Sequence, residues 1–311
     1  MCESRQVRIR GLAWIEIPSL AQGKFGCATA VLTVTGVYFA VGVVAFVAWR
    51  ITGDFQWVGN YFRTPGALLA VFLAATELYF SRRVLEHFSP GEPMRKAWAC
   101  IAASAAFDFA GTLLVQVLSK KSPLNPLRLM AWWTPDTALA IGRVGTLMGG
   151  TCRFSILALG LWFALRAYRR SGLMGRLNAI NWLALAAMAV YIVVEMLEIR
   201  GVLHSGKPVP IAVMAGWPVD PFLWLLLAQA SLLYRSSQQM GPGWVTRCWN
   251  SMAVGVFLVL FGDVAQWASN WGYLQWPWNS LVWYIWPLAG AAFALAPVYQ
   301  LEAIQRASAA D

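Results

Sequence analysis

The sequence has few charged residues for its length. Only 12% of its 311 residues are Asp, Glu, Lys or Arg, whereas charged residues make up about 25% of an ordinary soluble domain. Apolar residues make up 59%, and the mean hydropathy is +0.56. A water-soluble fold of this size would have to expose a large apolar surface, which excludes the soluble classes. The composition predicts an all-α integral membrane protein, because a helix satisfies its own backbone hydrogen bonds in lipid.

The residues that membrane-bound cofactors and catalytic centres need are also scarce. The two histidines, His87 and His204, are predicted on opposite sides of the membrane, which excludes a shared bis-histidine haem. No lysine lies in the middle of an apolar stretch, so a retinal Schiff base is excluded. The five cysteines form no CxxC pair, and HExxH, GxSxG and phosphate-binding glycine motifs are absent. We therefore predict no metal site, no resident cofactor and no catalytic centre of the chain's own.

Eight apolar stretches are long enough, or nearly so, for the roughly 20 residues that cross a hydrocarbon core. They are Ala28–Trp49, Pro65–Ser81, Ala97–Leu118, Ala138–Leu165, Leu177–Val194, Met214–Tyr234, Asn250–Trp271 and Leu281–Leu301. Pro65 opens the second stretch, and proline is tolerated as a first helical residue. The uninterrupted apolar part of the sixth stretch is shortened by Pro218, Asp220 and Pro221, so a count of seven helices stays open as an alternative.

Positive charges indicate the orientation. The net charge is +10, and the basic residues gather in short segments beside the apolar stretches, so binding to nucleic acid is not expected. With a cytoplasmic N-terminus, the inner segments hold fifteen Lys and Arg residues and the outer segments seven. Both termini are therefore predicted in the cytoplasm, with anionic headgroups of the cytoplasmic membrane as partners. Residues 1–27 form a cytoplasmic segment, in which Gly11–Ala21 is a candidate interfacial helix.

A faint internal repeat divides the chain. A shift of 152 residues matches Glu77 to Gln229, superimposes two Pro-Gly pairs and overlays the first apolar stretch on the fifth. The repeat predicts two four-helix halves in the same orientation, residues 28–165 and residues 166–311, an arrangement that occurs in transporters. Chance similarity between two inner loops is the alternative.

Polar residues follow one face of the third and fourth stretches. In the third they recur every four residues: Ser104, Asp108, Thr112 and Gln116. In the fourth they follow a three-four spacing: Arg143, Thr146, Gly150 and Arg153. Asp108 and Arg153 lie near the middle of their stretches, and sequential antiparallel helices are usually neighbours. We therefore predict an Asp108–Arg153 ion pair, which serves either assembly or a path for substrate or protons. Gly145 and Gly149 form a GxxxG step that permits close helix approach.

Asp263 is a further candidate residue for binding a ligand or protons. It shares a stripe with Gln266 on the seventh stretch, where no Lys or Arg accompanies it. Its partner is expected to be Arg153, Arg143, a water-filled cavity or a proton, because an isolated charge inside a membrane is costly.

Glu77 is a candidate at the end of the second stretch. It lies four residues before Ser81, so we expect it near the inner surface, within reach of water or Arg82.

Tryptophans gather on the predicted outer side, as an aromatic belt or as a stacking site for a ring or cation: Trp132, Trp133, Trp217, Trp271, Trp276, Trp278, Trp283 and Trp286.

The two membrane aspartates carry a resemblance to a family of enzymes. Phe107-Asp108 and Phe261-Gly262-Asp263 resemble the motifs of intramembrane aspartyl proteases of the presenilin and type IV prepilin peptidase kind. That resemblance implies two carboxylates that share a proton. Leu260 stands where the first glycine of the second motif would be, which is a departure from the pattern.

The helix count and the repeat carry a second resemblance. They are similar to the membrane subunits of polysulfide-reductase-type complexes, which have two four-helix halves and bind quinone without haem. This resemblance implies a quinone pocket lined by Asp108, Arg153 or Trp286 and a place within a larger complex.

The function we favour is that of a protein that binds, senses or transports a small or amphipathic molecule through polar groups among its helices. The quinone-binding or structural subunit is the alternative, and the protease is a remote one.

Overall fold

The computed structural model of the chain describes residues 26–118, 135–204, 218–241, 243–270, 272–274 and 282–310. Within these ranges the regular structure is entirely helical, which confirms the predicted all-α class. The candidate interfacial helix Gly11–Ala21 lies outside the described residues. Of the outer tryptophans, only Trp286 has a described side chain.

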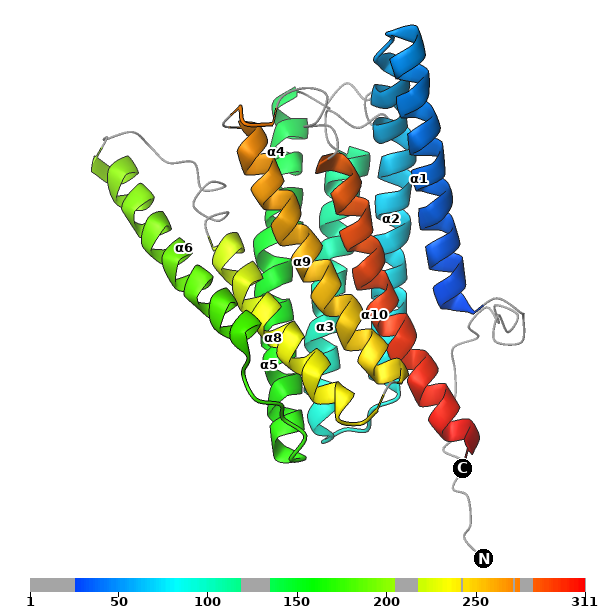
Figure 1. The fold of residues 1–311 in the computed structure, drawn as a ribbon, viewed down its shortest axis with the longest axis vertical. Coiled ribbons are helices and arrows are strands. Elements are labelled where there is room, and N and C mark those ends of the chain that lie inside the picture. The colour runs from blue at the N-terminus through cyan, green and yellow to red at the C-terminus, as the bar shows by residue number, and fades with distance from the viewer. Residues whose placement is uncertain are drawn as a thin grey trace, which may run out of the picture.

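The helices of the described ranges follow the predicted stretches in order (Figure 1). They are α1 (Cys27–Thr52), α2 (Gln56–Glu86), α3 (Pro93–Leu113), α4 (Pro135–Leu147), α5 (Arg153–Arg170), α6 (Ala179–His204), α8 (Val219–Gln238), α9 (Trp244–Asn270) and α10 (Val282–Ala310). Two short π-helices interrupt this series: η2 (Leu114–Leu118) continues α3, and η4 (Met148–Cys152) joins α4 to α5.

Seven helical spans among the described residues are long and apolar enough to cross a membrane. One of them consists of α4, η4 and α5 in series, and α3 with η2 forms another. The sixth predicted stretch, Met214–Tyr234, corresponds to α8, which is not among the seven. This is the architecture of a multi-pass membrane protein.

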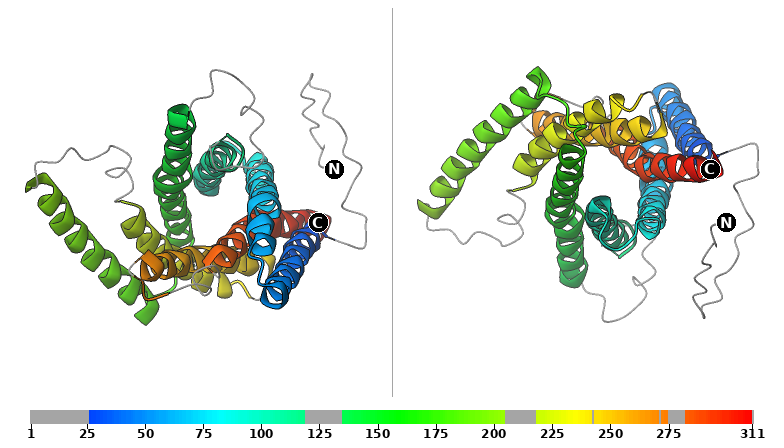
Figure 2. Two further views of the ribbon diagram at one scale, coloured as in Figure 1. Left: turned by 90° about the horizontal axis from the view of Figure 1, so that it is seen from above. Right: turned by 90° about the horizontal axis from the view of Figure 1, so that it is seen from below.

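Six of the helices form a closed ring. In order around the ring, α2 packs against α3, α3 against α5, α5 against α8, α8 against α9, α9 against α10, and α10 against α2. The views along the bundle show this arrangement (Figure 2). Helix α1 packs outside the ring against α2 and α10, and α6 packs outside it against α8. Both outer helices expose apolar side chains along much of their length, as helices in contact with lipid do.

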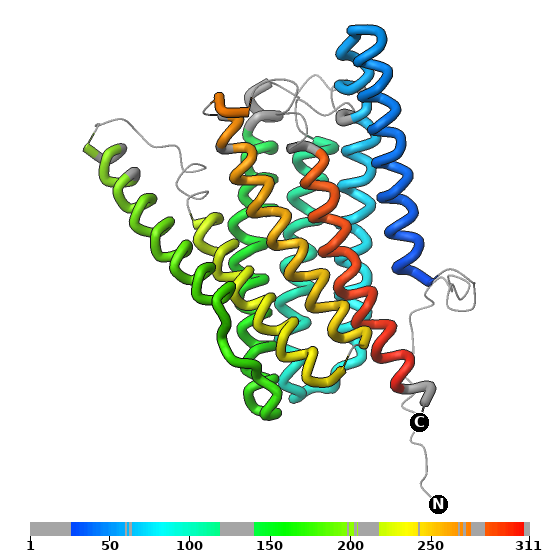
Figure 3. Tube along the Cα trace, viewed as in Figure 1, coloured from blue at the N-terminus to red at the C-terminus, as the bar shows by residue number. Residues whose placement is uncertain are grey.

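The two ends of the bundle differ in packing. The end that holds the C-terminus of α10 contains most of the apolar core, in which Trp98, Trp249, Leu157, Leu161 and Met252 are fully buried. A smaller cavity of about 250 Å³ also lies there, beside Phe88 and Tyr168. The indole nitrogen of Trp249 donates a 2.9 Å hydrogen bond to the Tyr168 hydroxyl. The start of α1 lies at the same end as the C-terminus of α10 (Figure 3). A side-chain carbon placed on Gly26 would lie 3.3 Å from a carboxylate oxygen of Glu302.

Helices α2 and α9 extend beyond the stretches expected from the sequence. Helix α2 begins at Gln56, so Pro65 lies inside the helix and not at its first residue. The helix also continues past Ser81 to Glu86. The seventh predicted helix begins earlier as well, since α9 starts at Trp244 and therefore includes Arg247. In each case a polar or proline residue suggested an end where tertiary packing continues the helix.

Candidate functional site

A cavity of about 940 Å³ occupies the half of the bundle opposite the C-terminus of α10. Its lining comes mainly from α2, α3 with η2, α4, η4, α9 and α10. Small residues leave this space open: Gly66, Ala70, Ala74, Gly111, Gly142, Gly145, Gly149, Gly150, Ala289 and Gly290. Most of the lining area is apolar, and a few polar and charged side chains lie within it. Pockets that bind small organic molecules have this size and composition.

The two π-helices lie beside the cavity, where η2 packs against α4 and η4 packs against α3. A side-chain carbon on Gly111 would lie 2.6 Å from both the Gly145 carbonyl oxygen and the Gly149 amide nitrogen, so the backbones are in direct contact. The GxxxG step predicted from the sequence therefore does bring two helices close together. The η4 helix contains consecutive glycines, Gly149 and Gly150, and ends at Cys152. A π-turn in this position is a frequent feature of functional sites, and it places the next residue, Arg153, at the bottom of the cavity.

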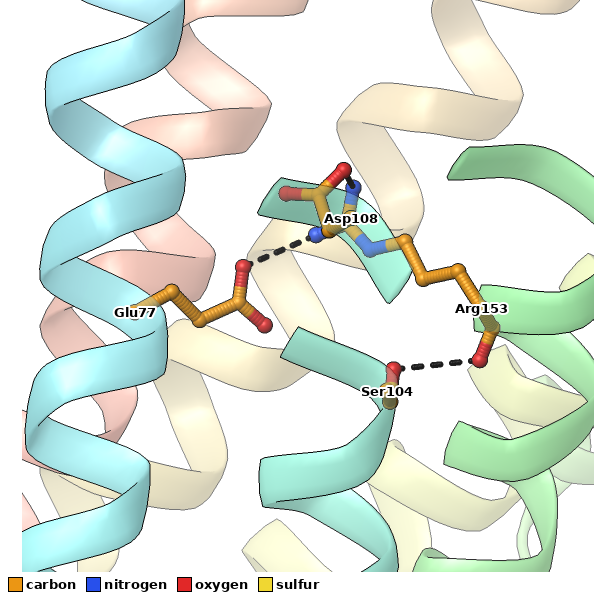
Figure 4. A network of polar contacts seen from close by, with 4 residues as sticks. All are labelled: Glu77, Ser104, Asp108 and Arg153. Atoms are coloured by element: carbon orange, nitrogen blue, oxygen red, sulfur yellow. Dashed lines mark hydrogen bonds and ion pairs between the residues drawn. The ribbon is translucent and has the colours of Figure 1, made fainter. Parts of the chain in front are cut away.

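Arg153 connects three helices (Figure 4). Its Nη1 donates a 2.8 Å hydrogen bond to Oδ1 of Asp108 on α3, and its Nη2 donates one of 3.0 Å to Oε2 of Glu77 on α2. Ser104 Oγ donates a 3.0 Å hydrogen bond to the Arg153 carbonyl oxygen. We call Glu77, Asp108 and Arg153 the charge cluster. It forms the floor of the cavity, above the apolar core.

The charge cluster is buried. Glu77 is 2% exposed and Arg153 is 8% exposed. The guanidinium carbon lies 4.6 Å from the centre of the Phe293 ring on α10, so an aromatic face covers the cation. If all three side chains are ionised, the cluster carries one excess negative charge. Two buried polar atoms of the cluster, Glu77 Oε1 and Arg153 Nε, have no hydrogen-bond partner among the described residues.

The Asp108–Arg153 pair predicted from the sequence is present. The position predicted for Glu77 is wrong: the carboxylate bonds Arg153 inside the bundle and does not reach water or Arg82. The mistake follows from ending the helix at Ser81. A stripe of buried residues on α2 could have placed Glu77 inside, because Ala74, Glu77, Ser81 and Val84 share one helix face.

The other predicted residues divide between the cavity and its surroundings. Asp108, Thr112 and Gln116 of the α3–η2 stripe line the cavity, as does the α4–α5 face with Arg143, Thr146, Gly150 and Arg153. Arg143 is exposed at the side of this cavity. Gln266 is half-buried and is not part of the cavity lining.

Asp263 lines the cavity from α9, beside Trp286 of α10. A side-chain carbon on Gly262 would lie 3.3 Å from the indole of Trp286, so this ring packs on the α9 backbone next to Asp263. No hydrogen bond or ion pair joins the Asp263 carboxyl to another residue of the described ranges. Asp220, in the first turn of α8, is near enough to act on Asp263 as a second negative charge.

Asp108 and Asp263 have different surroundings. Asp108 pairs with Arg153, whereas Asp263 makes no ion pair with a residue of the described ranges. Two carboxyls that share a proton must be direct neighbours, so this arrangement gives no support to the protease alternative. Among the described residues, no group of three or more His, Cys, Asp or Glu side chains is placed to hold a metal ion.

The comparisons with known proteins add no family to these observations. The chain matches no protein-family model, no curated protein and no solved structure.

Proposed function

We propose that the protein binds a small amphipathic molecule in the cavity and uses this binding for transport or for sensing. The cavity itself is the observation that supports the proposal. It has about 940 Å³ of space, mostly apolar walls, and a polar floor formed by the charge cluster. A molecule with an apolar body and one or two polar groups matches such a surface.

The arrangement of the ring supports the division into two parallel halves. A shift of 152 residues converts the bounds of α1, residues 27 and 52, into those of α6, residues 179 and 204. The same shift converts the end of α2 at Glu86 into the end of α8 at Gln238. Exchanging α2 with α8, α3 with α9 and α5 with α10 leaves the order of the ring unchanged. We therefore place the division between the halves after Arg170, where α5 ends. A ligand site between two repeats is typical of transporters.

We propose eight spans with both termini in the cytoplasm, in the cytoplasmic membrane. The proximity of Gly26 to Glu302 supports an even number of crossings, because it puts the start of α1 and the end of α10 at the same end of the bundle. The excess of Lys and Arg in the inner segments supports the cytoplasmic side. The cavity then lies in the outer half of the membrane, and the apolar core closes the inner half.

The test is ligand-dependent stabilisation of the purified protein in a mild detergent. A ligand that binds only the folded state raises the melting temperature in proportion to its affinity and concentration. We expect one or more members of a library of small amphipathic molecules to produce such a rise. Ala70 lines the cavity, so Ala70→Phe should fill it and abolish the rise. The matched control is Ala40→Phe on the exposed face of α1, which should retain it. An equal rise in both variants would place the binding elsewhere.

A quinone-binding subunit is the second candidate. The three residues that the sequence suggested for a quinone pocket, Asp108, Arg153 and Trp286, all line the same cavity. Organic extraction of the purified protein, followed by absorbance and mass analysis, tests this candidate directly. A quinone present in stoichiometric amounts, and lost in Ala70→Phe, would favour it over the transport or sensing reading.

A further inference from the structure

The charged residues around the cavity differ in whether they have a partner. Four charged residues line it: Asp108, Arg143, Arg153 and Asp263. Arg153 donates hydrogen bonds to Asp108 and to Glu77 behind it, so the charge cluster has no positive charge to spare for Asp263. Arg143 is exposed, and no ion pair joins it to a residue of the described ranges. Asp263 is thus the lining carboxylate without a partner in the described ranges.

The surroundings of Asp263 favour a positive charge. Asp220 adds a second carboxyl nearby, and the Trp286 ring lies against the same part of α9. An indole face attracts cations through its quadrupole, and a carboxylate attracts them by charge.

The size of the space points to an organic cation. A bare metal ion needs several oxygen ligands close together, and no such group of side chains exists among the described residues. The apolar walls and the 940 Å³ of space suit an apolar body attached to the charged group.

We propose, building on the function proposed above, that the ligand is an amphipathic organic cation whose positive group pairs with Asp263 and lies against the Trp286 indole. The ligand supplies the counter-charge that the described residues do not give to Asp263. Its apolar part lies against the small residues of α2 and α10.

The experiment uses three probes of similar shape and different charge. Tetraphenylphosphonium is cationic, tetraphenylborate is anionic, and triphenylphosphine oxide is neutral. Their binding to the full chain in an uncharged detergent is measured by equilibrium dialysis against empty micelles. We expect the cation to bind best, and Asp263→Asn to weaken its binding by about tenfold or more, since a buried ionic partner is lost. Arg143→Gln should strengthen the binding, because it removes a repelling charge at the cavity.

Two further variants separate binding from folding. Asp54→Asn makes the same chemical change at an exposed residue outside the cavity, and it should leave binding unchanged. Trp286→Leu should weaken cation binding by about threefold while Asp263 stays in place. Equal binding of the cationic and neutral probes, unchanged by Asp263→Asn, would overturn the cation inference and leave the proposed function standing. Failure of every probe would also overturn the inference, and the library screen with Ala70→Phe then decides the proposed function independently.

Discussion

The charge cluster gives a prediction about the order of stability of its variants. Arg153 is shared by Glu77 and Asp108 at 3.0 Å and 2.8 Å, so Arg153→Met leaves two buried carboxylates without a partner. Removing one member of a buried ion pair costs about 3–5 kcal/mol. Asp108→Asn, in contrast, leaves Arg153 and Glu77 as a balanced pair. It should cost about 1–3 kcal/mol, the range for a lost hydrogen bond to a charged group.

Melting temperatures in detergent measure this order. Since about 1 kcal/mol corresponds to roughly 2–4 °C in chains of moderate size, Arg153→Met should melt roughly 10 °C below the wild type. Asp108→Asn should melt only a few degrees below it. The triple variant with Glu77→Gln, Asp108→Asn and Arg153→Met carries no unpaired charge and should recover most of the loss. Equal effects of the two single variants, or a triple variant no more stable than Arg153→Met, would refute the shared-arginine arrangement.

Two further predictions concern packing and orientation. Gly111→Ala should lower the melting temperature by several degrees, because the added carbon would lie 2.6 Å from the backbone of the neighbouring helix. The control is Gly36→Ala, which should be neutral or stabilising because no atom lies within 4 Å of the added carbon. In intact cells, a thiol reagent that cannot cross the membrane should label Asn279→Cys and leave Ser89→Cys and Ala309→Cys unlabelled. Labelling of both Asn279→Cys and Ala309→Cys would contradict the eight-span topology.

The fold class and part of the site could be predicted from the sequence because they depend on local patterns. The four-residue spacing of Asp108 with Thr112 and Gln116 defines a helix face without knowledge of the partner helix. The depth of Asp108 and Arg153 along sequential spans was enough to pair them. The GxxxG step likewise identified a contact surface, although its partner, Gly111, is visible only in the folded chain.

The rest of the site depends on contacts between distant segments. The role of Glu77 was missed because α2 continues past Ser81, and only packing against α3 and α10 shows how far inside the carboxylate lies. The Phe293 ring over Arg153 joins residues 140 positions apart, and no spacing rule connects them. The two π-helices were also not predicted, and they lie beside the close contact of Gly111 with Gly145 and Gly149.

The position of the charge cluster along the chain has a consequence for biosynthesis. Glu77, Asp108 and Arg153 belong to consecutive spans, all made before α6 emerges from the ribosome. A charged residue at the centre of an inserting helix costs about 2.5–3.5 kcal/mol. Helix α3 packs against both α2 and α5, so Arg153 can pair with both carboxylates as soon as these three spans are in the membrane, before the remaining helices are translated. Asp263 follows later in the sequence, on a span that brings no cation at its depth.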